Sequence, residues 1–347
     1  MSIEPSRPVT LNDVAQVAGV STSTVSRVLN GGNRPVSKAL RSRILAVADS
    51  MGYVSNRAAQ ALRGRRTGVF MLVTDPGTDP IMAQAAGLEA AARERDVLAS
   101  VVVVRPENQA SVVQTLRGLR PRAIILNYAD PDASVWPELH GFVDEGGRLI
   151  TVGDDNSMAP SVRYEDTHSG LLMGAHLAGL GRRRPAIITS DNPSLRLRVA
   201  GVLSELSTAG TDPDTIPVTT VARTREAAAE AAYRLASSAT PPDLIYAAND
   251  VLAIGALHGV QSAGRRVPDD IAIAGNDDSP IAKDLTPPLT TISLDFHAGG
   301  RAALAMALSE GDPDDTSLPG RLIVRDSTSA SSARPAPAHS FSSGQGR

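Results

Sequence analysis

Residues 10–30 read TLNDVAQVAGVSTSTVSRVLN, a stretch that predicts two short helices joined by a tight turn. Thr10 and Asp13 have the spacing of a capping box, in which two side chains satisfy free backbone N–H groups at a helix start. Gly19 suits the left-handed conformation that ends a helix, and Ser21 is placed to begin the next one. This pattern is typical of a helix-turn-helix, whose second helix enters the major groove of DNA.

The two helices divide into an apolar face and a polar face. One small core can be closed by Val14, Ala15, Ala18, Val20, Val25, Val28 and Leu29, which leaves Thr22, Ser23, Thr24, Ser26, Arg27 and Asn30 as the polar remainder of the second helix. An arginine can donate two hydrogen bonds to guanine, and hydroxyls can bond phosphates or bases. The same residue types also serve as helix caps and solvated surface charges, so the helix alone leaves both interpretations open.

Charge sets this region apart from the rest of the chain. Residues 1–66 contain ten basic and three acidic residues, a net charge of +7, whereas residues 67–347 contain 24 basic and 34 acidic residues, a net charge of −10. A basic head on an acidic body is expected of a protein that binds nucleic acid through one end.

Composition narrows the class further. The 347 residues are 42% apolar, include no cysteine, and have six scattered histidines without metal-ligand spacing, so we expect no disulfide, no metal and no cofactor. No apolar run approaches the roughly 18 residues that a membrane span needs, and no signal peptide precedes the head, so we expect a soluble, cytoplasmic protein. Phosphate-loop, dinucleotide-binding and nucleophile-elbow motifs are missing, which argues against an enzyme and leaves no catalytic residue to name.

Two more segments complete the head. Ser37 is placed to cap a third helix that stops at Gly52. Residues 56–64, NRAAQALRG, could form a short helix that is marginal alone in water and becomes ordered when two copies pack on DNA. Leu62 is its one large apolar residue and could wedge between base steps in the minor groove.

After residue 67, apolar runs and amphipathic helices alternate. Strands are predicted at 69–73, 101–104, 123–127, 148–152, 186–189, 244–247 and 271–275, with helices at 81–95, 109–119, 169–180, 195–209, 224–236 and 250–263. Such alternation predicts parallel sheets with helices on both faces. About 260 residues suit two lobes of this kind, and ligands bind at the carboxyl ends of the strands.

The head closely resembles the lactose repressor and galactose repressor (LacI/GalR) family in three stretches: VTLNDVAQVAGVSTSTVSRVLNG, VSKALRSRILAVADSMGY and NRAAQALRG. The resemblance implies a transcriptional repressor that binds double-stranded DNA at a palindromic operator as a homodimer. It places Thr22, Ser23 and Arg27 on the base-reading face. It also implies DNA contacts by Arg34, in the turn after the second helix, and by Thr10, Ser21, Asn30, Asn56, Ala59 and Leu62.

The resemblance continues to about residue 328 and implies a periplasmic-binding-protein-like core that closes on a small, sugar-like effector. The expected domains are a head at 1–54, a hinge at 55–66, a core at 67–328 and a disordered tail at 329–347. Within the core, one lobe would comprise 67–164 and 295–318, and the other 165–294 and 319–328, with residues 321–326 as a last strand of the second lobe. Polar residues after predicted strands would hold the effector: Asp75, Asp79, Asp155, Arg198, Asn249 and Asp277.

Two departures from the family pattern concern the ligand. An NPFF-like stretch of the family is here TDPIM (78–82), and the aromatic position of its G-aromatic-DD loop is Asn276. Sugars commonly stack on such aromatic rings, so the effector could be a smaller or more polar molecule. An effector-independent repressor therefore stays open as an alternative, as does a solute-binding protein of the same fold. A loop cap is the competing interpretation of each polar residue at a strand end.

Overall fold

The computed structural model describes residues 9–30, 36–53, 68–74, 79–127, 133–153 and 159–329. The chain forms two compact units, Met1–Thr67 and Gly68–Arg347. Several predicted features lie outside the described residues. These are the hinge at 55–66 with Asn56, Ala59 and Leu62, the tail beyond residue 329, and the candidate site residues Arg34, Asp75 and Asp155.

The first unit contains the three predicted helices, α1 (Leu11–Ala18), α2 (Thr22–Asn30) and α3 (Lys38–Ser50). The predicted capping box is present at Thr10 and Asp13, and Gly19 ends α1 with a φ of 64°. Ser37 caps α3 by accepting a hydrogen bond from the Leu40 N–H at 3.3 Å. The three helices enclose one small core made of Val14, Ala15, Ala18, Val25, Val28, Ile44 and Ala48.

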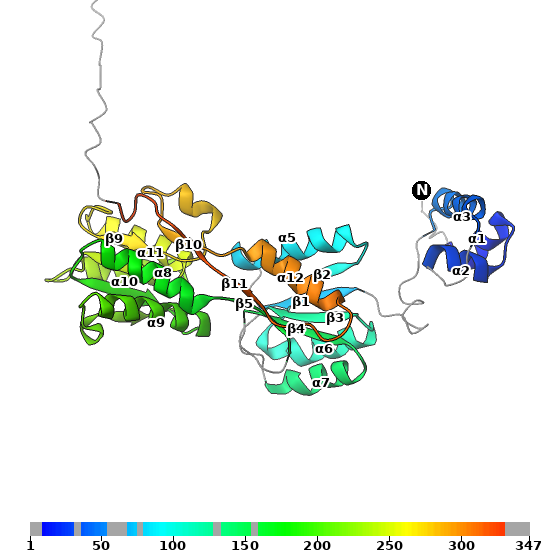
Figure 1. Ribbon diagram of the computed structural model, residues 1–347, viewed down its shortest axis with the longest axis horizontal. Helices are drawn as coiled ribbons and strands as arrows, with labels where there is room; N and C mark the ends of the chain where they lie inside the picture. The colour runs from blue at the N-terminus through cyan, green and yellow to red at the C-terminus, as the bar shows by residue number, and fades with distance from the viewer. Residues whose placement is uncertain are drawn as a thin grey trace, which may run out of the picture. The chain divides into compact units, whose positions relative to one another are not determined.

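The second unit contains two lobes, each built on a parallel sheet (Figure 1). The sheet of the first lobe has the order β11-β5-β4-β3-β1-β2, and all five of its strand pairings are parallel. Its strands are β1 (Val69–Val73), β2 (Ala99–Val103), β3 (Ala123–Asn127), β4 (Arg148–Val152), β5 (Ser161–Tyr164) and β11 (Thr316–Leu318). The predicted bounds of β1, β3 and β4 are confirmed residue for residue.

Helices cover both faces of this sheet (Figure 1). One face carries α5 (Asp79–Glu94) and α12 (Phe296–Leu308), and the other carries α6 (Gln109–Gly118) and α7 (Trp136–Asp144), with short 3₁₀ turns at Pro106–Asn108 and Ala133–Val135. Alternate residues of one strand serve the two layers: Met71 and Val73 pack with α5 and α12, and Leu72 packs with α6 and α7. Such two-sided burial explains the nearly continuous apolar runs of the sequence.

The second lobe repeats this plan with four parallel strands in the order β7-β6-β8-β9. The strands β6 (Pro185–Thr189), β8 (Leu244–Ala247) and β9 (Ala272–Ala274) are buried along their whole length, and β7 (Val218–Thr220) forms an edge. The helices pack in pairs, α8 (Asp166–Gly179) with α9 (Pro193–Thr208) and α10 (Arg225–Ala236) with α11 (Asp250–Ser262). Two 3₁₀ turns lie at Pro213–Thr215 and Pro280–Lys283.

The chain passes between the two lobes three times, after β5, after β10 (Thr291–Ser293) and after β11. The prediction for residues 321–326 needs correction. Only Arg321–Ile323 form a strand, β12, and it pairs antiparallel with β10 in a separate two-stranded sheet instead of joining the four parallel strands. Beyond Ile323 the backbone leaves the ladder, and the Arg325 N–H donates to the Thr290 hydroxyl at 2.8 Å.

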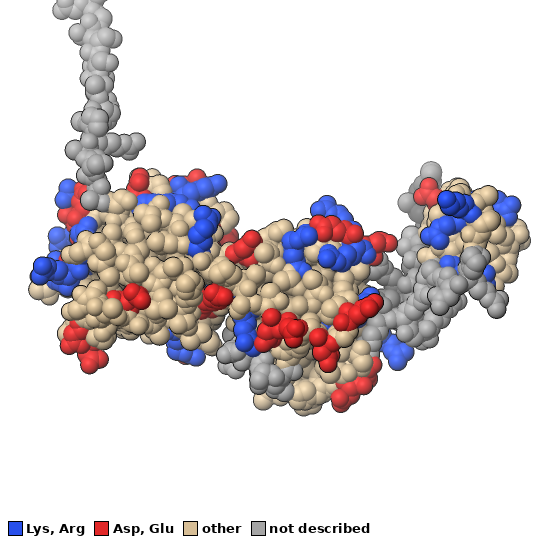
Figure 2. Space-filling view, in the orientation of Figure 1, with Lys and Arg blue, Asp and Glu red and all other residues tan. Residues whose placement is uncertain are grey.

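Basic and acidic side chains are interspersed over both lobes on the face shown in Figure 2. An example is the bidentate pair between Arg301 of α12 and Glu94 of α5, at 2.9 Å for both contacts.

Each helix of the described residues is too short or too polar to span a bilayer.

Helices α5 and α12 approach each other closely at two glycines. A Cβ atom on Gly300 would lie 1.9 Å from the Gln84 carbonyl oxygen, and one on Gly87 would lie 2.0 Å from the His297 carbonyl oxygen. Since these neighbours are backbone atoms, they cannot rotate away. The close contact explains why each helix has a glycine in its interior, Gly87 in α5 and Gly300 in α12, where glycine is otherwise unfavourable.

We predict that Gly300→Ala lowers the free energy of unfolding by about 1–3 kcal/mol, because the added methyl group forces α5 and α12 apart. Gly118→Ala is the matched control, since nothing lies within 4 Å of a Cβ atom there. It should leave the stability unchanged or raise it slightly. Urea denaturation of both variants measures the difference, and equal stability of the two would contradict the close contact.

Candidate DNA-binding surface and ligand cleft

The start of α2 is rich in exposed hydroxyl groups. The Ser21 Oγ accepts a hydrogen bond from the Thr24 N–H at 3.2 Å and lies 2.8 Å from the Ser23 Oγ and 2.9 Å from the Thr24 Oγ1. Ser21, Thr22 and Ser23 are all exposed, and Arg27 is half-buried on the same helix. Ser21 therefore caps α2 while its neighbours stay available for an external partner.

The beginnings of α1 and α2 differ in charge. In α1, Asp13 occupies the first turn, and its Oδ2 accepts from both the Thr10 N–H and the Thr10 hydroxyl at 2.7 Å. In α2, the first turn has no acidic residue. Because the positive end of a helix attracts anions, the start of α2 is the better suited of the two to a DNA phosphate. The Thr10 hydroxyl takes part in the capping box of α1, and its contact with DNA stays a prediction.

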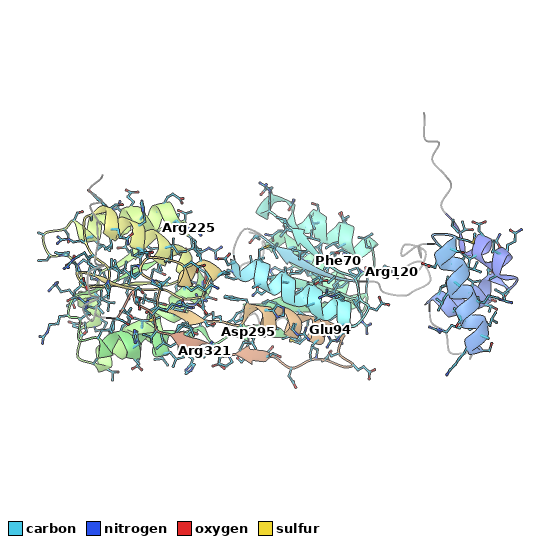
Figure 3. The ribbon with its side chains drawn as sticks, turned by 90° about the horizontal axis from the view of Figure 1, so that it is seen from above. Phe70, Glu94, Arg120, Arg225, Asp295 and Arg321 are labelled. Carbon is cyan, nitrogen blue, oxygen red and sulfur yellow. The ribbon has the colours of Figure 1, made fainter. Side chains whose placement is uncertain are left out.

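In the second unit, a cavity of about 400 Å³ lies between the two lobes. Its wall includes Asp79 at the start of α5, the Asp277–Pro280 loop after β9, the Ser293–His297 segment before and within α12, and Arg321. Figure 3 shows Asp295 and Arg321 near each other where the lobes meet. The cavity thus takes its wall from both lobes and from the segments that cross between them.

Beside this cavity lies a buried charge cluster centred on Arg198, which is 5% exposed. The Arg198 Nε donates to the Asp166 carboxylate at 2.6 Å, and one Nη donates to the Asp277 carboxylate at 2.8 Å and to the Ala248 carbonyl at 3.2 Å. Burial opposes the charge of Arg198, but Asp277 and Asp166 outweigh it and raise its pKa. Arg198 is therefore held as a cation that joins α8, α9 and the Asp277 loop.

The loop that Asp277 begins has an unusual backbone. Asp277 and Asp278 have φ values of 125° and 56°, a region that non-glycine residues rarely occupy. The Arg198 guanidinium donates to the Asp277 carboxylate, and the Arg325 guanidinium donates to the Asp278 carboxylate at 2.7 Å. The two arginines stabilise a conformation that presents both aspartates to the cavity.

The side chains of Asn249 and Asp250 are buried and form hydrogen bonds with other groups of the protein. The Asn249 Oδ1 caps α11 by accepting from the Leu252 N–H at 2.9 Å. The Asp250 carboxylate accepts from the Ser279 N–H and the Thr291 hydroxyl, both at 2.7 Å. Burial, followed by the nearby Asp277 carboxylate, raises the pKa of Asp250 to about 7.

The structure brings together some of the predicted ligand residues and separates others. Asp79 and Asp277 line the cavity, whereas Arg198 and Asn249 are not part of its wall. Asp278, the neighbour of Asp277 after the same predicted strand, also lines the cavity, whereas sequence reasoning missed Asp295, Phe296 and Arg321. These residues could have been found from the chain crossing expected near residue 295, because segments that pass between two lobes line the space between them.

Comparison with known proteins fits this architecture. Residues 10–56 match the family described as bacterial regulatory proteins, lacI family, and residues 175–328 match the periplasmic binding protein-like domain. The head is thus a lacI-family DNA-binding domain, and the core contains a periplasmic binding protein-like domain. It is similar to the HTH-type transcriptional regulator DegA of Bacillus subtilis, with 29% identity over 332 residues, 92% of this chain and 98% of DegA.

Two solved structures extend the likeness to the whole fold. A lac repressor dimer bound to operator and the anti-inducer ONPF is 26% identical, with a TM-score of 0.80 over 93% of this chain and 100% of that chain. A complex of the transcriptional regulator CelR with cellobiose is 27% identical, with a TM-score of 0.67 over 92% of this chain and 100% of that chain. This chain is a DNA-binding, repressor-like transcriptional regulator similar to those of the LacI family, and its relatives are regulators, not enzymes.

We predict that the Asp250 carboxyl makes the stability of this protein depend on pH. Its folded-state pKa of about 7 lies above its ordinary value of 3.8, so the folded state binds the proton more tightly and loses stability as the pH rises from about 4 to 7. The loss can reach about 1.4 kcal/mol per pH unit. Asp250→Asn should flatten this part of the profile in urea denaturation at several pH values.

The control for this variant is Asp270→Asn. The pKa of Asp270 is lowered to about 2, mainly by its hydrogen bond from Arg266, so its contribution to stability is lost only at lower pH. The control should keep the wild-type slope between pH 4 and 7. A wild-type slope in Asp250→Asn as well would show that Asp250 is not the group responsible.

Proposed function

We propose that this chain is a repressor that binds a palindromic operator as a homodimer and is controlled by a small polar effector in the cleft between its lobes. The observation that carries the proposal is the start of α2, where exposed hydroxyls and Arg27 share a helix with no acid in its first turn. The +7 charge of residues 1–66 supplies the attraction to phosphates. The operator-bound lac repressor dimer supports both the partner and the assembly.

In the proposed mode of binding, two copies of α2 enter successive major grooves. Arg27 bonds base edges, while Ser21 and the helix start contact phosphates. The helix at residues 56–64 and the wedging role of Leu62 stay predictions from the sequence. Effector binding would change the relative placement of the first lobes, and only a difference in effector affinity between two states can drive that change.

An exposed sheet edge supports the dimer. Strand β2 is at the end of the six-stranded sheet, and Val101 and Val103 on it are 41% and 49% exposed. Leu98, directly before the strand, is 42% exposed. Exposed apolar edge strands are avoided in monomers because they promote association. We therefore propose that β2 contributes to the surface between the two copies.

Arg27→Ala tests the DNA-binding proposal. Loss of a bidentate base contact should weaken binding to the preferred site by about 1–3 kcal/mol and relax the preference for one base pair. Arg43→Ala, at an exposed position of α3, is the matched control and should keep the base preference. Fluorescence anisotropy on the preferred site and single-base variants measures both effects, and equal losses on every sequence would make Arg27 a phosphate contact instead.

Val103→Asp tests the proposed dimer surface. A carboxylate at the exposed edge should be desolvated at the interface, so the variant should dissociate to monomers at concentrations where the wild type is dimeric. Leu197→Asp, at a position of α9 that is 48% exposed, should remain dimeric. Sedimentation velocity distinguishes the outcomes, and an intact Val103→Asp dimer would place the interface elsewhere.

A further inference from the structure

Carboxylates dominate the charged wall of the cavity between the lobes. Asp79 comes from the first lobe, Asp277 and Asp278 come from the second, and Asp295 lies at a crossing, whereas the basic groups there are Arg321 and His297. Acidic side chains also border the junction of the lobes on the face in Figure 2. Asp79 lies within TDPIM, the stretch that departs from the family pattern.

Only some of these acids are neutralised inside the protein. Arg198 pairs with Asp277, and Arg325 pairs with Asp278. Across the described ranges, Asp79 and Asp295 form no ion pair, and Asp295 uses one oxygen to cap α12 through the Ala298 N–H at 2.8 Å. Arg321 can offset one of these two charges, so the wall keeps a net negative charge.

The placement of the charges opposes closure of an empty cleft. Asp79 belongs to α5 of the first lobe, and the Asp277 loop belongs to the second, so closure brings carboxylates of both lobes toward each other. Like charges repel more strongly as water is excluded from the space between them. A cation held between the lobes would convert this repulsion into attraction.

Phe296 adds an aromatic surface to the same cavity. Its ring meets Tyr164 edge-on, with the ring centroids 4.9 Å apart and the planes at 63°. The Tyr164 hydroxyl accepts from the Gln84 Nε2 at 2.9 Å, and the Gln84 Oε1 accepts from the Asn127 Nδ2 at 2.6 Å. The ring is thus supported from the first lobe, and aromatic faces attract cations.

We infer that the effector carries a protonated amine on a small polar frame, as in an amino sugar or a short diamine. The inference rests on the proposed function, since it names the ligand class of the same cleft. Carboxylates at the wall would bind the ammonium group, and Phe296 would pack against the rest of the molecule. A cavity of about 400 Å³ is within the range of small-molecule sites.

Matched ligand pairs test this inference on the full-length protein. Calorimetric titrations would compare glucosamine with glucose, galactosamine with galactose, and diaminobutane with butanediol. The amine of at least one pair should bind about tenfold tighter than its hydroxyl counterpart, because it gains a charge-assisted contact. Asp79→Asn should remove most of this preference, whereas Asp144→Asn, at an exposed position of α7, should leave it unchanged.

Three results would overturn the inference: no binding of any amine, equal or tighter binding of the hydroxyl member in every pair, or an unchanged amine preference in Asp79→Asn. Selection of a DNA site by the same preparation is read separately. A protein that selects a DNA site and binds only the neutral members keeps the proposed function and loses this inference. A protein that prefers amines but selects no DNA site keeps this inference about the ligand and loses the proposed DNA-binding function.

Discussion

One buried guanidinium ties together the parts of the core that surround the cleft. Arg198 of α9 binds Asp166, which follows the first crossing between the lobes, and Asp277, which begins the loop at the cavity wall. Removing one partner of such a cluster leaves an uncompensated buried charge, which costs about 3–5 kcal/mol. The left-handed backbone of Asp277 and Asp278 is maintained by this arginine and by Arg325. The shape and charge of the cavity therefore depend on contacts behind its wall.

Packed side chains connect the cavity wall to the interior of the first lobe. Phe296 lines it and meets Tyr164 at the end of β5, and Gln84 of α5 bonds the Tyr164 hydroxyl. The glycine contacts between α5 and α12 allow little independent motion of these two helices. A ligand that moves Phe296 thus acts on the first lobe through packed side chains. This arrangement gives the proposed effector a physical route to the surface that carries β2.

Local patterns predicted the head and most of the core. The capping box at Thr10, the turn at Gly19 and the cap at Ser37 are decided by neighbours within three or four residues, so the sequence alone shows them. Buried strands such as β3 were equally clear because both faces are apolar. Helix α12 was missed, since its two adjacent glycines lower helix propensity and make sense only against distant neighbours, Tyr164 for Gly299 and α5 for Gly300. The three-residue strands β7, β10 and β11 are too short to show a pattern.

The cleft was less predictable because its contacts join distant segments. The rule that ligand residues follow strands placed Asp79 and Asp277 correctly at the cavity wall, yet the partners of Arg198 lie 32 and 79 residues away. The two missing family aromatics suggested a cleft without a ring, and Phe296 supplies one from α12.

The most direct test of the whole account is selection of binding sites from random duplex DNA by the full-length protein, followed by titration of the selected site at low and high salt. A palindromic site whose affinity falls steeply with salt is the predicted result, because phosphate contacts supply much of the binding. Failure to enrich any sequence would contradict a site-specific regulator.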